Sequence, residues 1–309
     1  MEADIYGIKM LAHEAFIRRA AAFGAPFMLK GSYVTRQYFD NPMDRIPADL
    51  DWNYLGILSN VDDARRTFSA WITAVTESDL DDGVQFRSFK ENAFWRMIDY
   101  AMSDDFPTVN TDLKCWLDGD KFEFTMDISF NLDVEVPPIA LIYKSLRGDS
   151  FIVPNTVPLA LQVSWKMHQS LVRPRFKDLF DLIHLLQHPD FNAQTLNDAL
   201  QALVNECSVD KVDLGRFNYL IFNDLDKLYP NNSIDENWDC WRHEIGRFRY
   251  PNNLINQDTA NEITDESQLP VGLLHFKKLF HEAVEKAGFT AVSLQDLPKS
   301  TRKKRKMYQ

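Results

Sequence analysis

Three acidic residues in the first half of the sequence have the types and spacing that a divalent metal ion requires. Asp49 and Asp51 are separated by one residue at the start of an alternating apolar and polar segment, residues 49–56. In an extended strand such residues face the same way, so both carboxylates can bind one hard cation such as Mg²⁺ or Mn²⁺. Asp127 lies on the polar face of a later alternating segment, residues 121–130, and is the expected third ligand. Two ions held in this way can clamp the attacking and leaving oxygens of a phosphoryl or nucleotidyl transfer.

A second candidate feature is the dipeptide Gly31-Ser32, which follows the short apolar run of residues 26–30. Glycine lets the backbone approach a phosphate closely because it has no Cβ atom. A serine hydroxyl and the N–H groups at a helix start favour an anion. We therefore expect Lys30, Gly31 and Ser32 to contact the phosphates of a nucleotide.

The second half of the chain carries charged residues at helical spacing. Lys166 and Arg173 fall on one stripe and are expected to neutralise a triphosphate. Asp181 shares a stripe with Lys177, and Asp178 lies beside it. Either acid can orient Lys166 or assist in activating the nucleophile. The alternative is a pair of surface helices whose charges pair with one another.

The elements that must position these residues change character along the chain. We expect an N-terminal helix that ends at Gly24, a helix over residues 61–77, and four strands, at residues 49–56, 84–89, 108–117 and 121–130. From Pro158 onward the periodicity predicts helices, near residues 158–172, 174–187, 194–206, 235–246 and 271–287, with Pro158 and Pro174 at first helical positions. This pattern predicts an α+β fold with an all-helical C-terminal half.

Charge and composition divide the chain further. We expect one domain over residues 1–150, a helical domain over residues 151–298 and a basic tail over residues 299–309. The net charge of the 309 residues is −11, and setting aside the six basic residues of the tail leaves −17. An acidic body argues against non-specific duplex binding, because phosphate contacts need cations. For an RNA partner the tail would supply the cationic surface, together with Arg36, Arg45, Arg173 and Arg175.

Several classes of protein are excluded by composition. No apolar run approaches the roughly 20 residues that span a bilayer, and the N-terminus lacks a basic signal-peptide region, so we expect a cytoplasmic protein without a membrane partner. The three cysteines are far apart, which disfavours a structural zinc site. His184 and His188 have no third ligand pattern beside them and are expected to pair on a helix surface.

The order of these motifs resembles a known family. Residues 29–32 (LKGS) and 49–52 (DLDW) resemble the G-S…D-x-D signature of polymerase-β-like nucleotidyltransferases. Residues 166–173 and 176–182 are similar to the later motifs of the AbiEii/AbiGii (MenT-like) toxin family. The resemblance covers about residues 5–190, and it implies a nucleotidyltransferase-type mixed sheet in the N-terminal half.

The resemblance also implies roles for the candidate residues. Ser32, Asp49 and Asp51 match the phosphate- and metal-binding positions, and Asp127 matches the third acid of the superfamily. Lys166 matches the essential lysine, and Asp178 and Asp181 match the late acids, of which we prefer Asp181. One departure is the long separation of Ser32 and Asp49, with 16 residues between them that include Pro42 and Pro47.

The implied activity is that of a Mg²⁺-dependent nucleotidyltransferase toxin of a toxin–antitoxin or abortive-infection system. It would transfer NMP from an NTP to an RNA, with the 3′ end of tRNA as the first candidate, and its protein partner would be a cognate antitoxin. Two alternatives stay open. The acceptor is a protein or a small molecule, or the chain is a non-catalytic interaction protein on the same scaffold.

Overall fold

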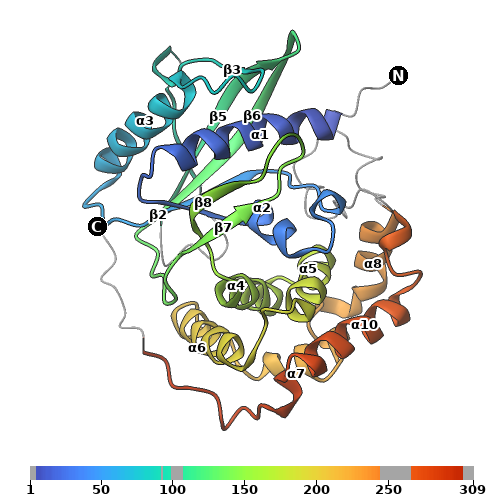
Figure 1. Ribbon diagram of the computed structural model, residues 1–309. Helices are drawn as coiled ribbons and strands as arrows, with labels where there is room; N and C mark the ends of the chain where they lie inside the picture. The colour runs from blue at the N-terminus through green and yellow to red at the C-terminus, as the bar shows by residue number, and fades with distance from the viewer. Residues whose placement is uncertain (1–4, 92, 99–106, 244–265, 302–309) are drawn as a thin grey trace. The chain divides into compact units, whose positions relative to one another are not determined.

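The computed structural model describes residues 5–91, 93–98, 107–243 and 266–301 (Figure 1). Within them the chain forms two compact units. The first contains the described residues up to 37 and residues 46–157. The second contains residues 38–45 and the described residues from 158 onward. Residues 302–309, which make up most of the predicted basic tail, lie outside the described residues.

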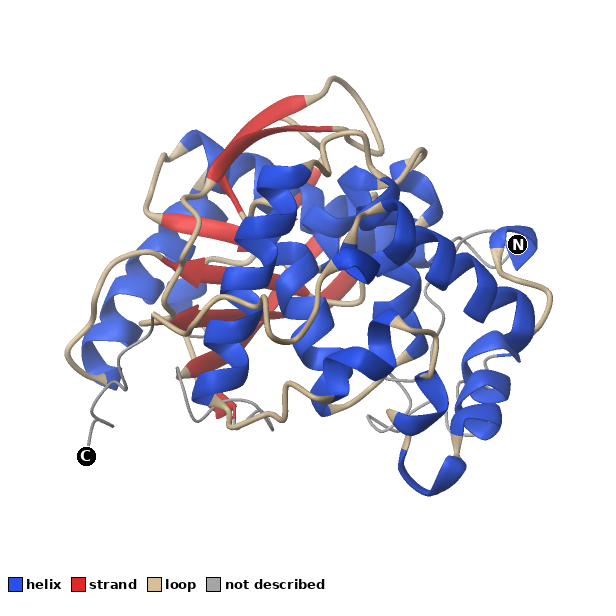
Figure 2. Ribbon diagram, turned by 90° about the horizontal axis from the view of Figure 1, so that it is seen from below, coloured by secondary structure: helices blue, strands red, loops and turns tan. Residues whose placement is uncertain are grey.

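A mixed sheet forms the first unit, and all of the described strands belong to it (Figure 2). Its order is β3-β5-β6-β2-β1-β8-β7, with β4 also paired to β5. The strands are β1 (Phe27–Lys30), β2 (Leu50–Tyr54), β3 (Val84–Phe86), β4 (Arg96–Ile98), β5 (Thr108–Leu117), β6 (Asp120–Phe130), β7 (Ile139–Tyr143) and β8 (Phe151–Thr156). The central pair β2 and β6 is parallel, whereas β1 and β2 are antiparallel.

The hairpin of β5 and β6 shows how the sequence specifies its own turn. Asp118 and Gly119 form the two-residue connection, and both have positive φ, of 54° and 90°. An Asp-Gly pair is favoured there because a type I′ turn requires positive φ at both central positions and matches the twist of the strands. The alternation predicted for residues 121–130 is confirmed, since Phe124, Met126 and Ile128 are all buried.

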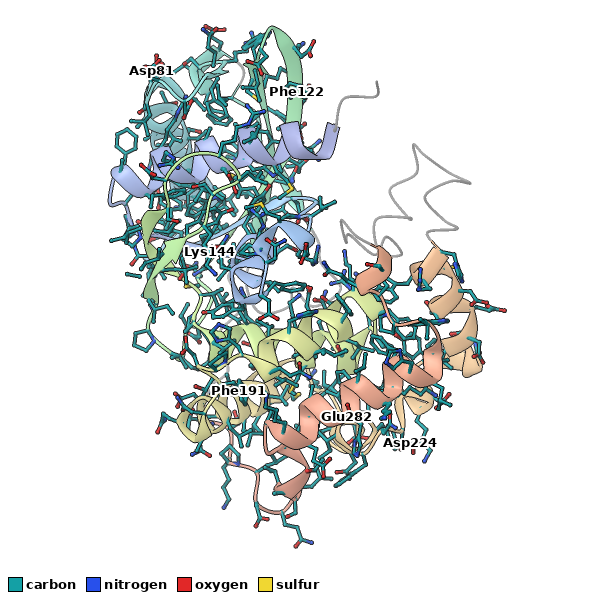
Figure 3. All side chains as sticks on the ribbon, turned by 45° about the vertical axis from the view of Figure 1, so that its right-hand side comes forward. Asp81, Phe122, Lys144, Phe191, Asp224 and Glu282 are labelled. Atoms are coloured by element: carbon teal, nitrogen blue, oxygen red, sulfur yellow. The ribbon has the colours of Figure 1, made fainter. Side chains whose placement is uncertain are left out.

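Helices α1 (Ile5–Ala22) and α3 (Val61–Glu77) pack on each other, and α1 also contacts β5, β6 and β8 (Figure 1). Apolar side chains fill the space between helix and sheet (Figure 3). Trp71 of α3 stacks on Phe27 of β1 with ring centroids 3.7 Å apart. Gly24 has a φ of +57° just beyond α1, which confirms the predicted helix end.

The sequence pattern does not predict two of the observed strands, β7 and β8, and assigns residues 139–156 to no element. Prolines in and before these strands explain why they are missed. Pro137, Pro138 and Pro154 are typical of chain breaks, because proline cannot donate to a ladder. The sheet accommodates them because β7 is an edge strand and its pairing with β8 is irregular between Ile139 and Leu141, opposite Pro154.

The second unit is helical within its described residues, as predicted. Its helices are α4 (Leu159–Val172), α5 (Phe176–Gln187), α6 (Ala193–Val209), α7 (Arg216–Ile221), α8 (Ile234–His243) and α10 (Leu273–Lys286). The predicted helix over 235–246 begins within one residue of α8, and its last residues, from position 244, lie outside the described residues. Pro158 is the N-cap of α4 rather than its first residue, and Pro174 precedes the N-cap of α5, so both proline placements are wrong by one or two positions.

Aromatic side chains build the core of the second unit. Phe176 of α5 lies within 5.8 Å, ring centre to ring centre, of Trp238, Trp241 and Phe276. These rings join α5 to α8 and α10, so α5 is covered on this side by other helices. No helix in the described parts of the chain combines the length and the apolar character needed to cross a membrane.

Candidate active site

The Gly31-Ser32 turn connects β1 to the short helix α2 (Ser32–Thr35). The carbonyl of Gly31 accepts hydrogen bonds from the N–H groups of Val34 and Thr35, at 3.1 and 3.0 Å. Gly31 has a φ of +70°, and a Cβ atom on it would lie 2.2 Å from Oδ2 of Asp51. Only glycine therefore fits here, and the turn lies directly against the second carboxylate of the D-x-D pair.

Strand register brings the carboxylates together. Asp51 on β2 pairs with Lys30 on β1 and with Asp127 on β6. Neighbouring strands lie about 4.8 Å apart, and paired residues present their side chains on the same face. Asp49 lies one residue before β2 and two before Asp51. The Nζ atom of Lys30 lies 3.7 Å from Oδ1 of Asp51, so the first unit places Lys30, Gly31, Asp51 and Asp127 side by side.

Asp127 is held by a chain of polar contacts. Its carboxylate accepts a hydrogen bond from the side-chain amide of Asn110 on β5. The amide oxygen of Asn110 in turn accepts a hydrogen bond from Nε of Arg96, at 2.8 Å. Asp127 and Asn110 are both 5% exposed. The orientation of this carboxylate is therefore fixed by neighbouring strands before any ligand binds.

The donor set of the first unit suits a hard cation. Mg²⁺ prefers oxygen ligands and is commonly held by one or two carboxylates, with waters and substrate phosphates completing its shell. Asp51 and Asp127 match that requirement by their shared register. Among the described residues, no group of three or more His, Cys, Asp or Glu side chains could hold a metal ion.

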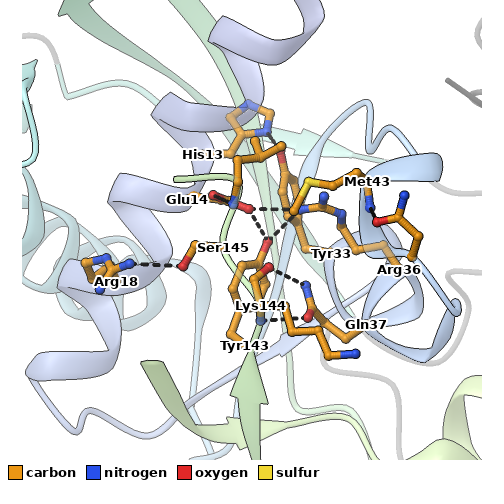
Figure 4. A network of polar contacts seen from close by, with 12 residues as sticks. His13, Glu14, Arg18, Tyr33, Arg36, Gln37, Met43, Tyr143, Lys144 and Ser145 are labelled. Carbon is orange, nitrogen blue, oxygen red and sulfur yellow. Dashed lines mark hydrogen bonds and ion pairs between the residues drawn. The ribbon is translucent and has the colours of Figure 1, made fainter. Parts of the chain in front are cut away.

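The helix that follows Ser32 is anchored by a buried polar network (Figure 4). Arg36 donates to Oε1 of Glu14 at 2.9 Å and to the hydroxyl of Tyr143 at 3.2 Å. That hydroxyl donates to the same carboxylate oxygen of Glu14 at 3.1 Å, and the N–H of Leu146 donates to the other oxygen at 2.8 Å. Arg36 is fully buried. The prediction that Arg36 supplies cationic surface for RNA is wrong, because its guanidinium is buried and forms an ion pair with Glu14.

Further polar contacts hold Tyr33 and Gln37, which lie before and after Arg36 in the sequence. Nδ1 of His13 lies 2.5 Å from the hydroxyl of Tyr33, the residue after Ser32. Burial lowers the pKa of His13 well below its usual value, with a smaller contribution from Lys9, so the ring stays neutral at physiological pH. Gln37 exchanges hydrogen bonds with the backbone of Lys144. The chain that follows the Gly31-Ser32 turn is thus fixed to α1 and to the end of β7.

In the second unit, the predicted lysine and late acids meet. The Nζ atom of Lys166 on α4 donates to Oδ2 of Asp181 at 2.8 Å and to Oδ1 of Asp178 at 3.2 Å, both on α5. The Lys166 side chain is 11% exposed, and those of Asp178 and Asp181 are 4% and 0% exposed. The alternative of two surface helices with paired charges is wrong for these three residues, because the charges are buried.

Two arginines complete this cluster, and sequence reasoning missed their roles. Arg45 donates through Nε to Oδ1 of Asp181 at 2.8 Å and through a terminal nitrogen to Oδ2 at 3.1 Å. Arg175 donates through Nε to Oδ2 of Asp178 at 2.6 Å. The expectation that Arg45 provides cationic surface is wrong, since its side chain is 2% exposed. Arg173 is exposed and follows the last residue of α4.

Protonation in this cluster favours the charged forms. Burial alone would lower the pKa of Lys166, but the charges of Asp181 and Asp178 outweigh it and raise the pKa. Burial alone would raise the pKa of both acids, but Arg175 and Lys166 lower that of Asp178, and Arg45 and Lys166 lower that of Asp181. Lys166 therefore remains an ammonium ion suited to binding phosphate. Asp181 is suited to orienting that ammonium ion, because both of its oxygens are already engaged by cations.

His184 of α5 and His188, the residue after α5, both contact aromatic rings. His184 stacks on Phe39, with ring centroids 3.9 Å apart and planes at 15°. His188 meets the ring of Tyr38 edge-on at 5.0 Å. Together with Arg45, these contacts dock residues 38–45 on α5. The stripe predicted as a helix surface is therefore the surface on which this segment packs.

The chain is similar to known proteins over most of its length. The family described as "Nucleotidyl transferase AbiEii toxin, Type IV TA system" matches residues 15–262. The solved structure of the nucleotidyltransferase toxin MenT4 from Mycobacterium tuberculosis is similar with a TM-score of 0.51 at 10% identity, covering 96% of this chain and 88% of that one. JHP933 from Helicobacter pylori aligns with a TM-score of 0.41 at 12% identity, covering 94% and 99%. No curated protein sequence matches significantly.

Proposed function

Because this chain belongs to the AbiEii nucleotidyltransferase toxin family of type IV toxin–antitoxin systems, we propose that it transfers NMP from an NTP to an RNA acceptor. The first candidate acceptor is the 3′ end of tRNA. In the transfer, the 3′ hydroxyl loses its proton to solvent and its oxygen forms a bond to the α-phosphorus. The bond from this phosphorus to the bridging oxygen breaks, and pyrophosphate leaves. The observation that best supports the proposal is the register of Asp51 and Asp127 beside the Gly31-Ser32 turn.

The carboxylates of the first unit are the proposed metal ligands. Asp51 and Asp127 would hold Mg²⁺ or Mn²⁺, with Asp49 as a further ligand from the start of β2. When bound, the ion offsets the negative charge of the phosphates and of the reacting oxygens. The Ser32 hydroxyl and the adjacent backbone are proposed to bind phosphate oxygens, and Gly31 leaves room for them. The buried network on Arg36 keeps this turn in place.

Lys166 is the proposed cation for the triphosphate. Asp181 and Asp178 outweigh the effect of burial and raise the pKa of Lys166, which favours its charged form. Held between these two carboxylates, the ammonium group can stabilise negative charge as pyrophosphate departs. Asp181 and Asp178 orient it. Arg173, exposed beyond α4, is proposed to contribute further positive charge to the phosphates.

One observation favours the second candidate, a protein or small-molecule acceptor. Two of the arginines expected to attract RNA, Arg36 and Arg45, are buried and paired with carboxylates. The chain is acidic overall, with a net charge of −11. Binding of an RNA acceptor would then depend on Arg173, Arg175 and the basic tail. The experiment below distinguishes the two classes of acceptor.

The test incubates the purified protein with each of the four α-labelled NTPs, with Mg²⁺ or Mn²⁺, and with total tRNA or a tRNA-free protein extract. Label on tRNA supports the proposed acceptor, and label on protein or on a small molecule supports the second candidate. The absence of label with every NTP, metal and acceptor contradicts the proposed transfer. If calorimetry then shows no NTP binding by the folded protein, the non-catalytic alternative is favoured.

The family also implies a partner protein, the antitoxin of a type IV system. We propose that the toxin acts in the cytoplasm, where NTPs and tRNA are found. Expression of the chain alone should then slow cell growth, and co-expression of the cognate antitoxin should restore it. Normal growth with an active chain and no antitoxin would argue against a toxin.

A further inference from the structure

Arg45 contacts the lysine–aspartate cluster of the second unit from a distant part of the sequence. It precedes Asp181 by 136 residues, and its guanidinium donates one hydrogen bond to each carboxylate oxygen. Such a two-point contact fixes the plane of a carboxylate, which a single-point contact does not. Asp181 is fully buried, so no solvent competes with this pairing.

The plane of Asp181 determines where Lys166 can lie. Oδ2 of Asp181 accepts from Lys166 at 2.8 Å, and the same oxygen accepts from Arg45 at 3.1 Å. Rotation of the carboxylate would move this oxygen and leave Asp178 as the nearer partner of the ammonium. The position of Lys166 therefore depends on Arg45 through the carboxylate of Asp181, which both side chains contact.

Arg45 is itself held in place by its segment. Phe39 stacks on His184, and Tyr38 packs on His188, one and two turns along α5 from Asp181. Residues 38–45 thus follow α5 with a contact at each turn. A guanidinium held in this way loses little further conformational freedom when it binds its carboxylate.

We propose that Arg45 is a positioning residue of the transfer reaction, which fixes Asp181 and thereby places the Lys166 ammonium for the triphosphate of the NTP. The expected effect on NTP binding rests on the proposed function. The placement of Lys166 by Arg45 and Asp181 does not, because it is a property of the folded protein without nucleotide. The two can therefore be tested separately.

The experiment compares Arg45→Gln and Arg45→Lys with matched changes at Arg19. Arg19 is an equally buried arginine of the first unit, with its own two-point contact to Asp82 at 2.6 and 3.3 Å. Protein with ¹⁵N-labelled lysine side chains reports the Lys166 ammonium by NMR, and a Lys166→Arg sample identifies its signal. Thermal unfolding measures the structural cost of each variant, and the KM for NTP measures the consequence.

We expect Arg45→Gln to shift or broaden the Lys166 signal and to raise the KM for NTP about tenfold, while Arg19→Gln changes the unfolding temperature alone. Arg45→Lys should give an intermediate KM, because it keeps the charge and loses the two-point contact; it also serves if Arg45→Gln does not fold. An unchanged Lys166 signal and KM in the Arg45 variants would overturn the positioning role. A shifted signal in a protein that transfers no nucleotide would contradict the proposed function and leave the positioning of Lys166 intact.

Discussion

Asp51 on β2 and Asp127 on β6 are direct partners in the register of two parallel strands. The chain between them includes the helix α3 and the strands β3, β4 and β5, so the two carboxylates come together only when the sheet has formed. Each has a neighbour that fixes it: Lys30 lies beside Asp51, and Asn110 donates to Asp127. The proposed metal site is therefore preorganised by backbone pairing rather than by a flexible loop.

Replacement of Asp51 by Asn should abolish transfer with little loss of stability. We expect activity to fall by roughly a hundredfold or more, because a metal ion stabilises several kcal/mol of charge in the transition state. The free energy of unfolding should change by about 1 kcal/mol or less, since the ion pair with Lys30 is partly exposed. Asp118→Asn, in the turn between β5 and β6, is the control that should keep full activity. Equal activities would remove Asp51 from the site.

A methyl group at Gly31 should have two separable effects. Gly31→Ala costs about 1–3 kcal/mol, because a φ of 70° with a ψ of −155° is a conformation that essentially only glycine adopts. Its Cβ would also lie 2.2 Å from the Asp51 carboxylate. Gly148→Ala is a matched control, because Gly148 has a φ of +75° and no atom within 4 Å of an added Cβ. Both variants should lose stability in urea unfolding, and only Gly31→Ala should lose transfer. Full activity in Gly31→Ala would show that the close approach to Asp51 is unimportant.

The hydroxyl of Tyr143 should contribute measurably to stability. Tyr143→Phe leaves Arg36 and Glu14 with one partner fewer in a buried network, at a cost of about 1–3 kcal/mol. Tyr229 is the control, because its buried hydroxyl has no hydrogen-bond partner among the described residues. Tyr229→Phe should be neutral or slightly stabilising in the same thermal unfolding measurement. If the two variants unfold alike, the network does not anchor the helix after Ser32.

Stability should fall as the pH drops below about 6.5, the ordinary pKa of histidine. Burial lowers the pKa of His13 in the folded chain, so the unfolded chain takes up a proton first and acid favours unfolding. Glu14 acts in the opposite direction, because burial raises its pKa. Comparing urea unfolding of the wild type with His13→Gln at pH 7.5 and 5.5 cancels the Glu14 contribution. The variant should lose less stability on acidification, and exposed His275→Gln should behave as the wild type does.

The residues that a local sequence pattern can reveal are predicted correctly. Alternation predicted the strand that carries Asp127, and helical spacing placed Lys166, Asp178 and Asp181 on two helices that do meet. The role of Arg45 could not be predicted, because its partner Asp181 lies 136 residues away and no local pattern shows that residues 38–45 pack on α5. Strands β7 and β8 were missed because their prolines obscure an edge hairpin whose irregular pairing tolerates them.

The packing of residues 38–45 on α5 has a consequence for how the chain can be divided. The boundary after Val157 separates the two units in sequence, but a C-terminal fragment that begins there would lack Arg45. In that fragment Asp181 would lose its two-point partner, and truncation of a buried ion pair costs about 3–5 kcal/mol. During synthesis, Arg45 can pair with Asp181 only after α5 has left the ribosome. The toxin is thus complete only when most of its chain has been made.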